Sequence, residues 1–151
     1  VLALAGCPLT PAMLIGSLGL DDSGPGTVWG GTEYHVLLFA EGMVVNLDDL
    51  SNPAPVESMT GTLPGGPGAE YTSINYLLTH VPEGAYFLLA WVDSNGTPGF
   101  NRYQDYYGFF DCDPDALPSF VGAQPIYPNV NIPRSGVVDV DLVLGVNPGA
   151  S

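Results

Sequence analysis

The chain has 151 residues, of which 46% are hydrophobic, so it is long enough for one globular domain with a substantial core. Its 20 glycines and 15 prolines are too many for a helical protein and suit short strands joined by turns. The formal net charge is -14 and lysine is absent, so the chain lacks the clustered cations that nucleic acids and anionic membrane surfaces require. Composition therefore indicates an acidic all-β domain whose natural counterparts are cations.

The first 20 residues carry no charge and are mostly apolar. Within them, the run Leu4-Ala5-Gly6-Cys7 resembles the lipobox of bacterial lipoproteins, in which the cysteine is acylated and becomes the new N-terminus. In this interpretation, residues 1–5 end a signal segment, and a lipid on Cys7 is the chain's contact with a membrane. We expect an extracytoplasmic protein, at the cell surface or secreted.

A second interpretation makes the same segment a structural arm. Pro8 and Pro11 interrupt its first part and leave residues 12–20 as a strand. Ten buried apolar side chains are worth on the order of 15 kcal/mol, so we expect this strand to be covered, by its own sheet or by that of a neighbouring copy. The residues that would make the contact are Ala12, Met13, Leu14, Ile15, Leu18 and Leu20.

The stretch from Asp21 to Thr27 is polar and rich in glycine, which is typical of a flexible linker. It predicts a division of the chain into an arm with its linker over residues 1–26 and a domain over residues 27–151. Such a linker would let the arm leave its own domain. Copies of the chain itself are therefore the expected partners.

Alternating apolar residues predict the first strands of the domain. Thr32 to Glu41 places Tyr34, Val36, Leu38 and Ala40 on one face and His35, Leu37 and Phe39 on the other. Residues 43–47 continue as a second short strand, and residues 48–55 and 63–69 are rich in turn formers and predict loops.

Two apolar runs between Ile74 and Val92 are joined by the turn Val81-Pro82-Glu83-Gly84. Proline presets φ at the second turn position and glycine accepts a positive φ, so the segment predicts a central hairpin. Its second strand is apolar on both faces, which predicts cover on both sides. The faces are formed by Phe87, Leu89 and Trp91, and by Tyr86, Leu88 and Val92.

The alternation is clearest between Gly136 and Leu144. Asp139 and Asp141 lie on one face, and the other face is formed by Val138, Val140, Leu142 and Leu144. One solvent-exposed face and one apolar face predict a strand of an antiparallel sheet. Taken together, the strands predict an all-β fold, a two-sheet antiparallel β-sandwich.

The run V-P-E-G-A-Y-F-L-L-A-W-V-D-S-N-G, residues 81–96, resembles the signature of transthyretin-like, carboxypeptidase-regulatory-like domains. These domains occur in bacterial surface proteins and lipoproteins. The resemblance implies a non-catalytic, seven-strand Greek-key sandwich of Ig-like type, in which Tyr86 anchors a corner. It also implies that the Tyr/Asp-rich stretch at about residues 93–128 is an insertion.

This stretch carries the oxygen ligands that calcium requires. The candidate ligands are Asp93, Asn95, Asn101, Asp105, Asp111, Asp113 and Asp115. The opening D-S-N-G resembles a calcium loop, but the spacing that should follow and a closing bidentate glutamate are absent. An ion site and a plain Asx-rich turn both fit the pattern.

Cys7 and Cys112 are the two cysteines of the chain. They could form one disulfide that ties the arm to the insertion, or Cys7 could be acylated and Cys112 free. Sequence does not choose between these alternatives, because the choice depends on geometry.

These features bear on three classes of function. The apolar arm favours a structural cell-surface protein that assembles with its own copies into a filament. The alternative is a lipid-anchored module that binds a surface carbohydrate or protein, with Trp29, Trp91 and the tyrosine-rich stretch as stacking faces. An enzyme is not expected, since His35 and His80 lie in no catalytic or metal-binding motif.

Overall fold

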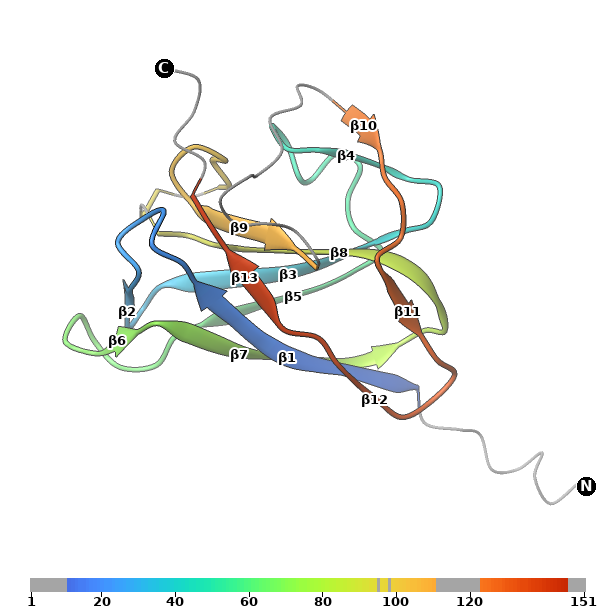
Figure 1. Ribbon diagram of the computed structural model, residues 1–151, viewed down its shortest axis with the longest axis horizontal. Coiled ribbons are helices and arrows are strands. Elements are labelled where there is room, and N and C mark those ends of the chain that lie inside the picture. Colours follow the sequence, from blue (N-terminus) through green and yellow to red (C-terminus); the bar gives the residue numbers. More distant parts are fainter. Residues whose placement is uncertain (1–10, 95, 98, 111–122, 147–151) are drawn as a thin grey trace, which may run out of the picture.

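The computed structural model describes residues 11–94, 96–97, 99–110 and 123–146 (Figure 1). Within them, the chain forms strands and turns. The strands are β1 (Ala12–Leu20), β2 (Val28–Trp29), β3 (Glu33–Ala40), β4 (Val44–Asn46), β5 (Glu57–Thr62), β6 (Glu70–Tyr71), β7 (Ser73–Val81), β8 (Gly84–Val92), β9 (Tyr106–Phe109), β10 (Ala123–Pro125), β11 (Val130–Ile132), β12 (Val137–Asp139) and β13 (Leu142–Leu144).

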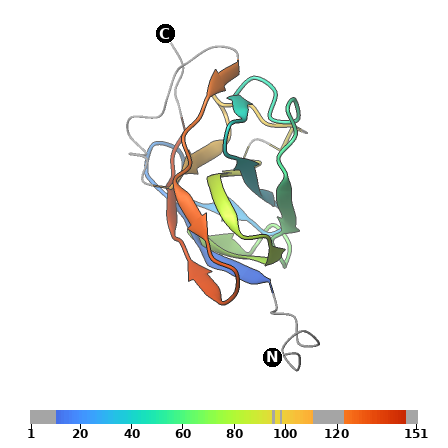
Figure 2. The same ribbon diagram turned by 90° about the vertical axis from the view of Figure 1, so that its right-hand side faces the viewer.

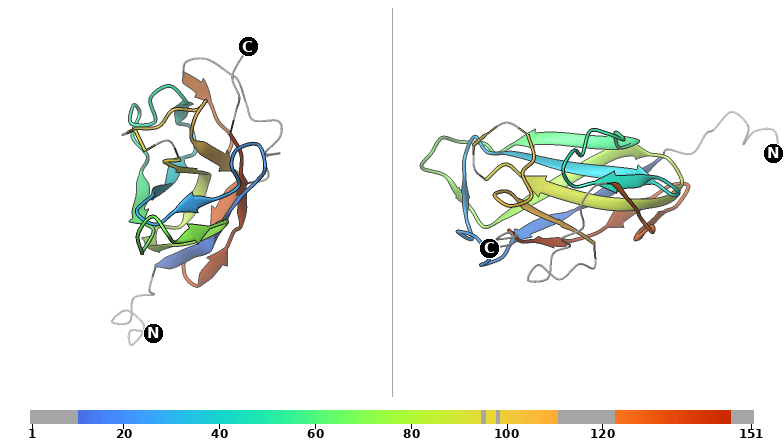
Figure 3. Two further views of the ribbon diagram at one scale, coloured as in Figure 1. Left: turned by 90° about the vertical axis from the view of Figure 1, so that its left-hand side faces the viewer. Right: turned by 90° about the horizontal axis from the view of Figure 1, so that it is seen from above.

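Two sheets pack face to face, as the edge-on view in Figure 2 and the views in Figure 3 show. In the first, which we call the β1 sheet, β1 lies between β7 on one side and β12 with β13 on the other. In the second, the β8 sheet, the order is β5-β3-β8, and both β9 and β11 pair with the far edge of β8. The predicted all-β sandwich is confirmed.

The apolar segment at residues 12–20 is the central strand of the β1 sheet. Leu14 lies opposite Leu78 of antiparallel β7, and Leu18 lies opposite Leu142 of parallel β13. Ala12, Leu14 and Leu18 are fully buried. The expected arm is therefore a strand of the domain itself, because both of its edges and one of its faces are covered by the same chain.

The segment at residues 21–27, expected as a flexible linker, is held against the domain. The amide of Asp21 donates a hydrogen bond to the Leu144 carbonyl (3.0 Å). The buried hydroxyl of Tyr106 donates to the carbonyl of Asp21 (2.9 Å) and accepts from the amide of Gly26 (2.7 Å). The expected boundary near residue 27 consequently does not separate two structural units.

The expected central hairpin is wrong, because its two strands lie in different sheets. β7 pairs with β1, whereas β8 pairs with β3, so the turn at residues 81–84 crosses from one layer to the other. Ile74, Tyr76 and Leu78 of β7 are buried on one face only, as a strand of an outer layer requires. The hydroxyl of Tyr86 donates to the carbonyl of Pro82 (2.8 Å) and fastens this crossing.

β8 is covered on both sides, as its sequence predicts. Leu88 and Ala90 face the core between the sheets, and Leu89 and Trp91 face a second core on the outer side. The second core is closed by β4 and by the loops that carry Leu47, Leu50, Phe100 and Ile126. This extra layer explains why β3 and β8 lack a polar face.

The stretch expected as an insertion contributes a strand to the sandwich. β9 pairs with β8, so that Tyr107 lies opposite Trp91 and Tyr106 lies opposite Val92. Both tyrosines are fully buried, one in each core. They are part of the fold and do not form an exposed surface.

The closing segment is parallel to β1, in contrast to the antiparallel pairing expected from its sequence, and it is interrupted at Val140 and Asp141. The register is the same on both sides of the break, with Met13 opposite Val137 and Leu18 opposite Leu142. At the break, the Val140 carbonyl turns toward β1 and accepts a hydrogen bond from the Tyr76 hydroxyl (2.6 Å).

Gly16 allows the Val140 carbonyl to lie close to the backbone of β1, since a Cβ at position 16 would lie 1.8 Å from the Val140 oxygen. The neighbouring Ser17 amide donates to the Asp141 carboxylate (2.9 Å), which replaces the missing ladder bond. Gly16 therefore sets how closely the closing segment packs on β1.

We predict that Gly16→Ala lowers the free energy of unfolding by at least about 2 kcal/mol, because the backbone of Val140 must move and break its bond to Tyr76. Gly19→Ala is the matched control in the same strand, where the added Cβ would lie 3.7 Å from the Leu142 carbonyl oxygen, an ordinary contact. It should change stability by less than about 1 kcal/mol. Urea denaturation followed by circular dichroism measures both, and equal losses would contradict the role of Gly16.

Candidate binding cleft

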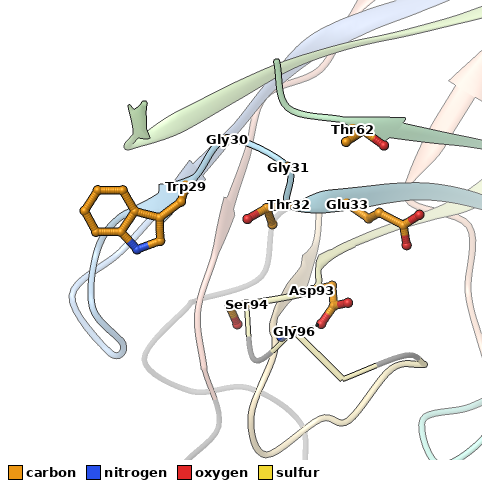
Figure 4. Close-up of a pocket in the computed structure, with 9 residues that line it drawn as sticks. All are labelled: Trp29, Gly30, Gly31, Thr32, Glu33, Thr62, Asp93, Ser94 and Gly96. Carbon is orange, nitrogen blue, oxygen red and sulfur yellow. Dashed lines mark hydrogen bonds between the residues drawn. The ribbon is translucent and has the colours of Figure 1, made fainter. Parts of the chain in front are cut away.

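A cleft of about 700 Å³ opens at the end of the β8 sheet where β3 begins and β8 ends (Figure 4). Figure 4 shows the indole of Trp29 at one end and the carboxylates of Glu33 and Asp93 at the other, with Thr32 and Ser94 between them. The lining residues are Trp29, Gly30, Gly31, Thr32, Glu33, Thr62, Asp93, Ser94 and Gly96.

Trp29 is held by a tight turn. The Thr32 amide donates to the Trp29 carbonyl (3.1 Å), and Gly31 has a φ of 91°, which together define a type II turn that needs glycine at its third position. The turn is fixed to the chain beside it, because the Gly30 amide donates to the Ala69 carbonyl (2.9 Å). Trp29 nevertheless stays 47% exposed.

Glu33 and Asp93 face each other at the ends of two paired strands. Tyr34 lies opposite Val92 in the β3–β8 ladder, and the Asp93 amide donates to the Glu33 carbonyl (2.9 Å), which extends the register by one pair. Burial raises the pKa of Asp93, and the charge of Glu33 raises it further, whereas the hydrogen bond from the Gly96 amide and the nearby His35 lower it. Two carboxylates thus share one end of the cleft.

His35 lies next to this pair on the same face of the sheet. Its ring stacks on Trp91, with 4.1 Å between the centroids, and its Nδ1 lies 2.9 Å from the Thr60 hydroxyl. Burial lowers the pKa of His35, although Glu33 and Asp93 oppose the shift. Its Nε2 is 4.0 Å from the Glu33 carboxylate. A neutral His35 leaves the charges of the two carboxylates uncompensated at neutral pH.

In the described part of the chain, two of the candidate calcium ligands bond to backbone amides. The buried carboxylate of Asp105 accepts hydrogen bonds from the amides of Ser94 (3.1 Å) and Asn101 (2.8 Å), and the side chain of Asn101 accepts from the Tyr103 amide (2.9 Å). Both residues therefore stabilise the loop that follows β8. Asp93 lies in the cleft. Among the described residues, no three His, Cys, Asp or Glu side chains are grouped to hold a metal ion.

Several predicted residues lie outside the described part of the chain, namely Cys7, Asn95, Asp111, Cys112, Asp113 and Asp115. The predicted lipidation, the predicted disulfide and this part of the calcium site thus stay predictions. In the portion that is described, no helix is both long and apolar enough to cross a membrane.

The aromatic residues expected as stacking faces differ in their exposure to solvent. Trp91 is buried under His35, and Tyr106 and Tyr107 are fully buried, so they offer no surface to a ligand. Trp29 is available in the cleft. Sequence reasoning missed Glu33, because nothing in the sequence alone indicates that it lies opposite Asp93.

Comparisons of the chain with family models, curated proteins and solved structures give no match. The function is accordingly inferred from the geometry of the cleft.

We predict that Glu33→Gln raises the free energy of unfolding by about 0.5 kcal/mol at about pH 8, because like charges directly opposite each other in a sheet are destabilising. Glu83→Gln, in the exposed turn before β8, is the matched control and should have no such effect. Thermal unfolding monitored by circular dichroism measures both. A destabilised Glu33→Gln variant would contradict the described pairing.

The pairing of Glu33 with Asp93 also predicts that the effect of Glu33→Gln on stability depends on pH. The folded-state pKa of Asp93 is raised, so the native state binds this proton more tightly than the unfolded state does. The resulting stabilisation is present below the unfolded-state pKa and is lost as pH rises through the folded-state pKa. The advantage of Glu33→Gln over the wild-type chain should consequently shrink as the pH is lowered through this range.

Proposed function

We propose that this domain is a non-enzymatic binding module of an exported protein and that it binds carbohydrate in the cleft at Trp29. The half-exposed indole on a rigid turn carries the proposal. A flat aromatic face packs against the apolar face of a sugar ring, and a few fixed polar groups orient such a ligand. The hydroxyls of Thr32 and Thr62 and the two carboxylates supply these groups.

The position of β1 favours binding over self-assembly. Assembly through residues 12–20 requires a strand that can pair with another copy. Both edges of β1 are already hydrogen-bonded, to β7 and to β12 with β13. A self-assembly function stays a prediction, but the feature that suggested it is used within the domain.

The proposed family is transthyretin-like. The hydrogen bond from the Tyr86 hydroxyl to the Pro82 carbonyl supports it, because the resemblance implied that this tyrosine anchors a corner. A surface setting, a lipid on Cys7 and a bound calcium ion accompany the proposal as further predictions. Each is independent of carbohydrate binding at Trp29.

We predict that Trp29→Ala weakens binding to a soluble oligosaccharide at least about tenfold, which corresponds to about 1.4 kcal/mol. Isothermal titration calorimetry against a panel of neutral and amino-sugar oligomers makes the measurement. Tyr127→Ala is the control, since Tyr127 is 86% exposed and does not line the cleft.

Unchanged binding by Trp29→Ala, or an equal loss in Tyr127→Ala, would contradict the assignment of the cleft. The absence of binding to every oligomer in the panel would contradict carbohydrate binding itself.

A further inference from the structure

We propose that the cleft selects glycans that carry free, positively charged amino groups over N-acetylated, neutral or acidic glycans. This inference rests on the proposed carbohydrate-binding function and adds the chemical class of the ligand. It starts from the charge of the cleft, whose lining includes two carboxylates and neither of the chain's two arginines.

The placement of the two carboxylates is fixed by the sheet. Glu33 lies opposite Thr62 of β5 on one side and, by the hydrogen bond from the Asp93 amide, opposite Asp93 on the other. These three residues form a row across the adjacent ends of β5, β3 and β8, and all three line the cleft. The register of the whole β3–β8 ladder would have to shift to move the carboxylates apart.

Two like charges in this position repel each other, and the net charge of -14 adds to the repulsion. Burial is the main cause of the raised pKa of Asp93, and the charge of Glu33 also contributes, so ionised Asp93 is in an unfavourable environment. A cation placed between the carboxylates would relieve both effects. An ammonium group suits this position, because its three N–H donors can bond to more than one acceptor.

The other end of the cleft offers the exposed side chain of Trp29. An aromatic face there packs against a sugar ring and, through its π system, also attracts a nearby cation. A sugar ring on the indole, with an amino group directed toward Glu33 and Asp93, would satisfy both ends. The carboxylate of an acidic sugar would be repelled by Glu33 and Asp93, and an N-acetyl group carries no charge that could pair with them.

The test compares oligomers of glucosamine and of N-acetylglucosamine by isothermal titration calorimetry at about pH 6, where a free amine is protonated. The wild-type chain should bind the glucosamine oligomer at least about tenfold more tightly. In the double variant Glu33→Gln/Asp93→Asn this preference should disappear, while binding of the N-acetylated oligomer remains.

A polycation could also bind to the acidic surface without using the cleft, so a second double variant serves as control. Glu41→Gln/Glu83→Gln removes two exposed charges at the other end of the β8 sheet, Glu41 being about 26 Å along β3 from Glu33. This variant should keep the preference for the glucosamine oligomer.

Equal affinity of the wild-type chain for the two oligomers would overturn the inference and leave carbohydrate binding intact. A preference that survives in Glu33→Gln/Asp93→Asn, or that is lost equally in Glu41→Gln/Glu83→Gln, would also overturn it. Failure of both oligomers and of a neutral glucose oligomer to bind would overturn the inference together with the proposed function.

Discussion

The contact between Gly16 and the Val140 carbonyl is the constraint on which the sandwich depends. β1 has to accept an antiparallel neighbour on one edge and a parallel, interrupted neighbour on the other. The Val140 carbonyl occupies the space that a side chain at position 16 would need, and the Tyr76 hydroxyl across β1 bonds to the same oxygen. One oxygen atom therefore links β7, β1 and the closing segment, and it fixes the layer that covers β3 and β8.

The cleft follows from the same arrangement. With one face covered by the β1 sheet and the other by the second core, the middle of β3 and most of β8 are buried, and polar residues appear at the end of the sheet that forms the cleft. Glu33 and Asp93 occupy these exits, on opposite strands. Their closeness is a consequence of the ladder register, which hydrophobic packing on both faces holds in place. The fold thus maintains a pair of like charges that local forces alone would separate.

Local pattern was sufficient to predict the all-β class, β3, both faces of β8 and the strand at residues 12–20, because burial leaves a periodic trace in a sequence. The sequence pattern does not indicate which strands pair with each other. The turn at residues 81–84 satisfies the rules for a hairpin equally well when its strands separate into two sheets. β5 was missed because its sequence, ESMTGT, is mostly polar, as suits an edge strand. Glu33 could not be assigned to the cleft without knowing the strand that lies opposite it.

The fold builds β1 into its own domain, and this position is the reason for proposing the cleft, and not an exchanged strand, as the functional surface. Hydrogen–deuterium exchange of the β1 amides, measured over a wide range of protein concentrations, tests it most directly. The account predicts that these amides exchange in the slowest class and that their protection is unchanged on dilution. Protection of β1 that falls on dilution, together with dissociation of an oligomer, would contradict it.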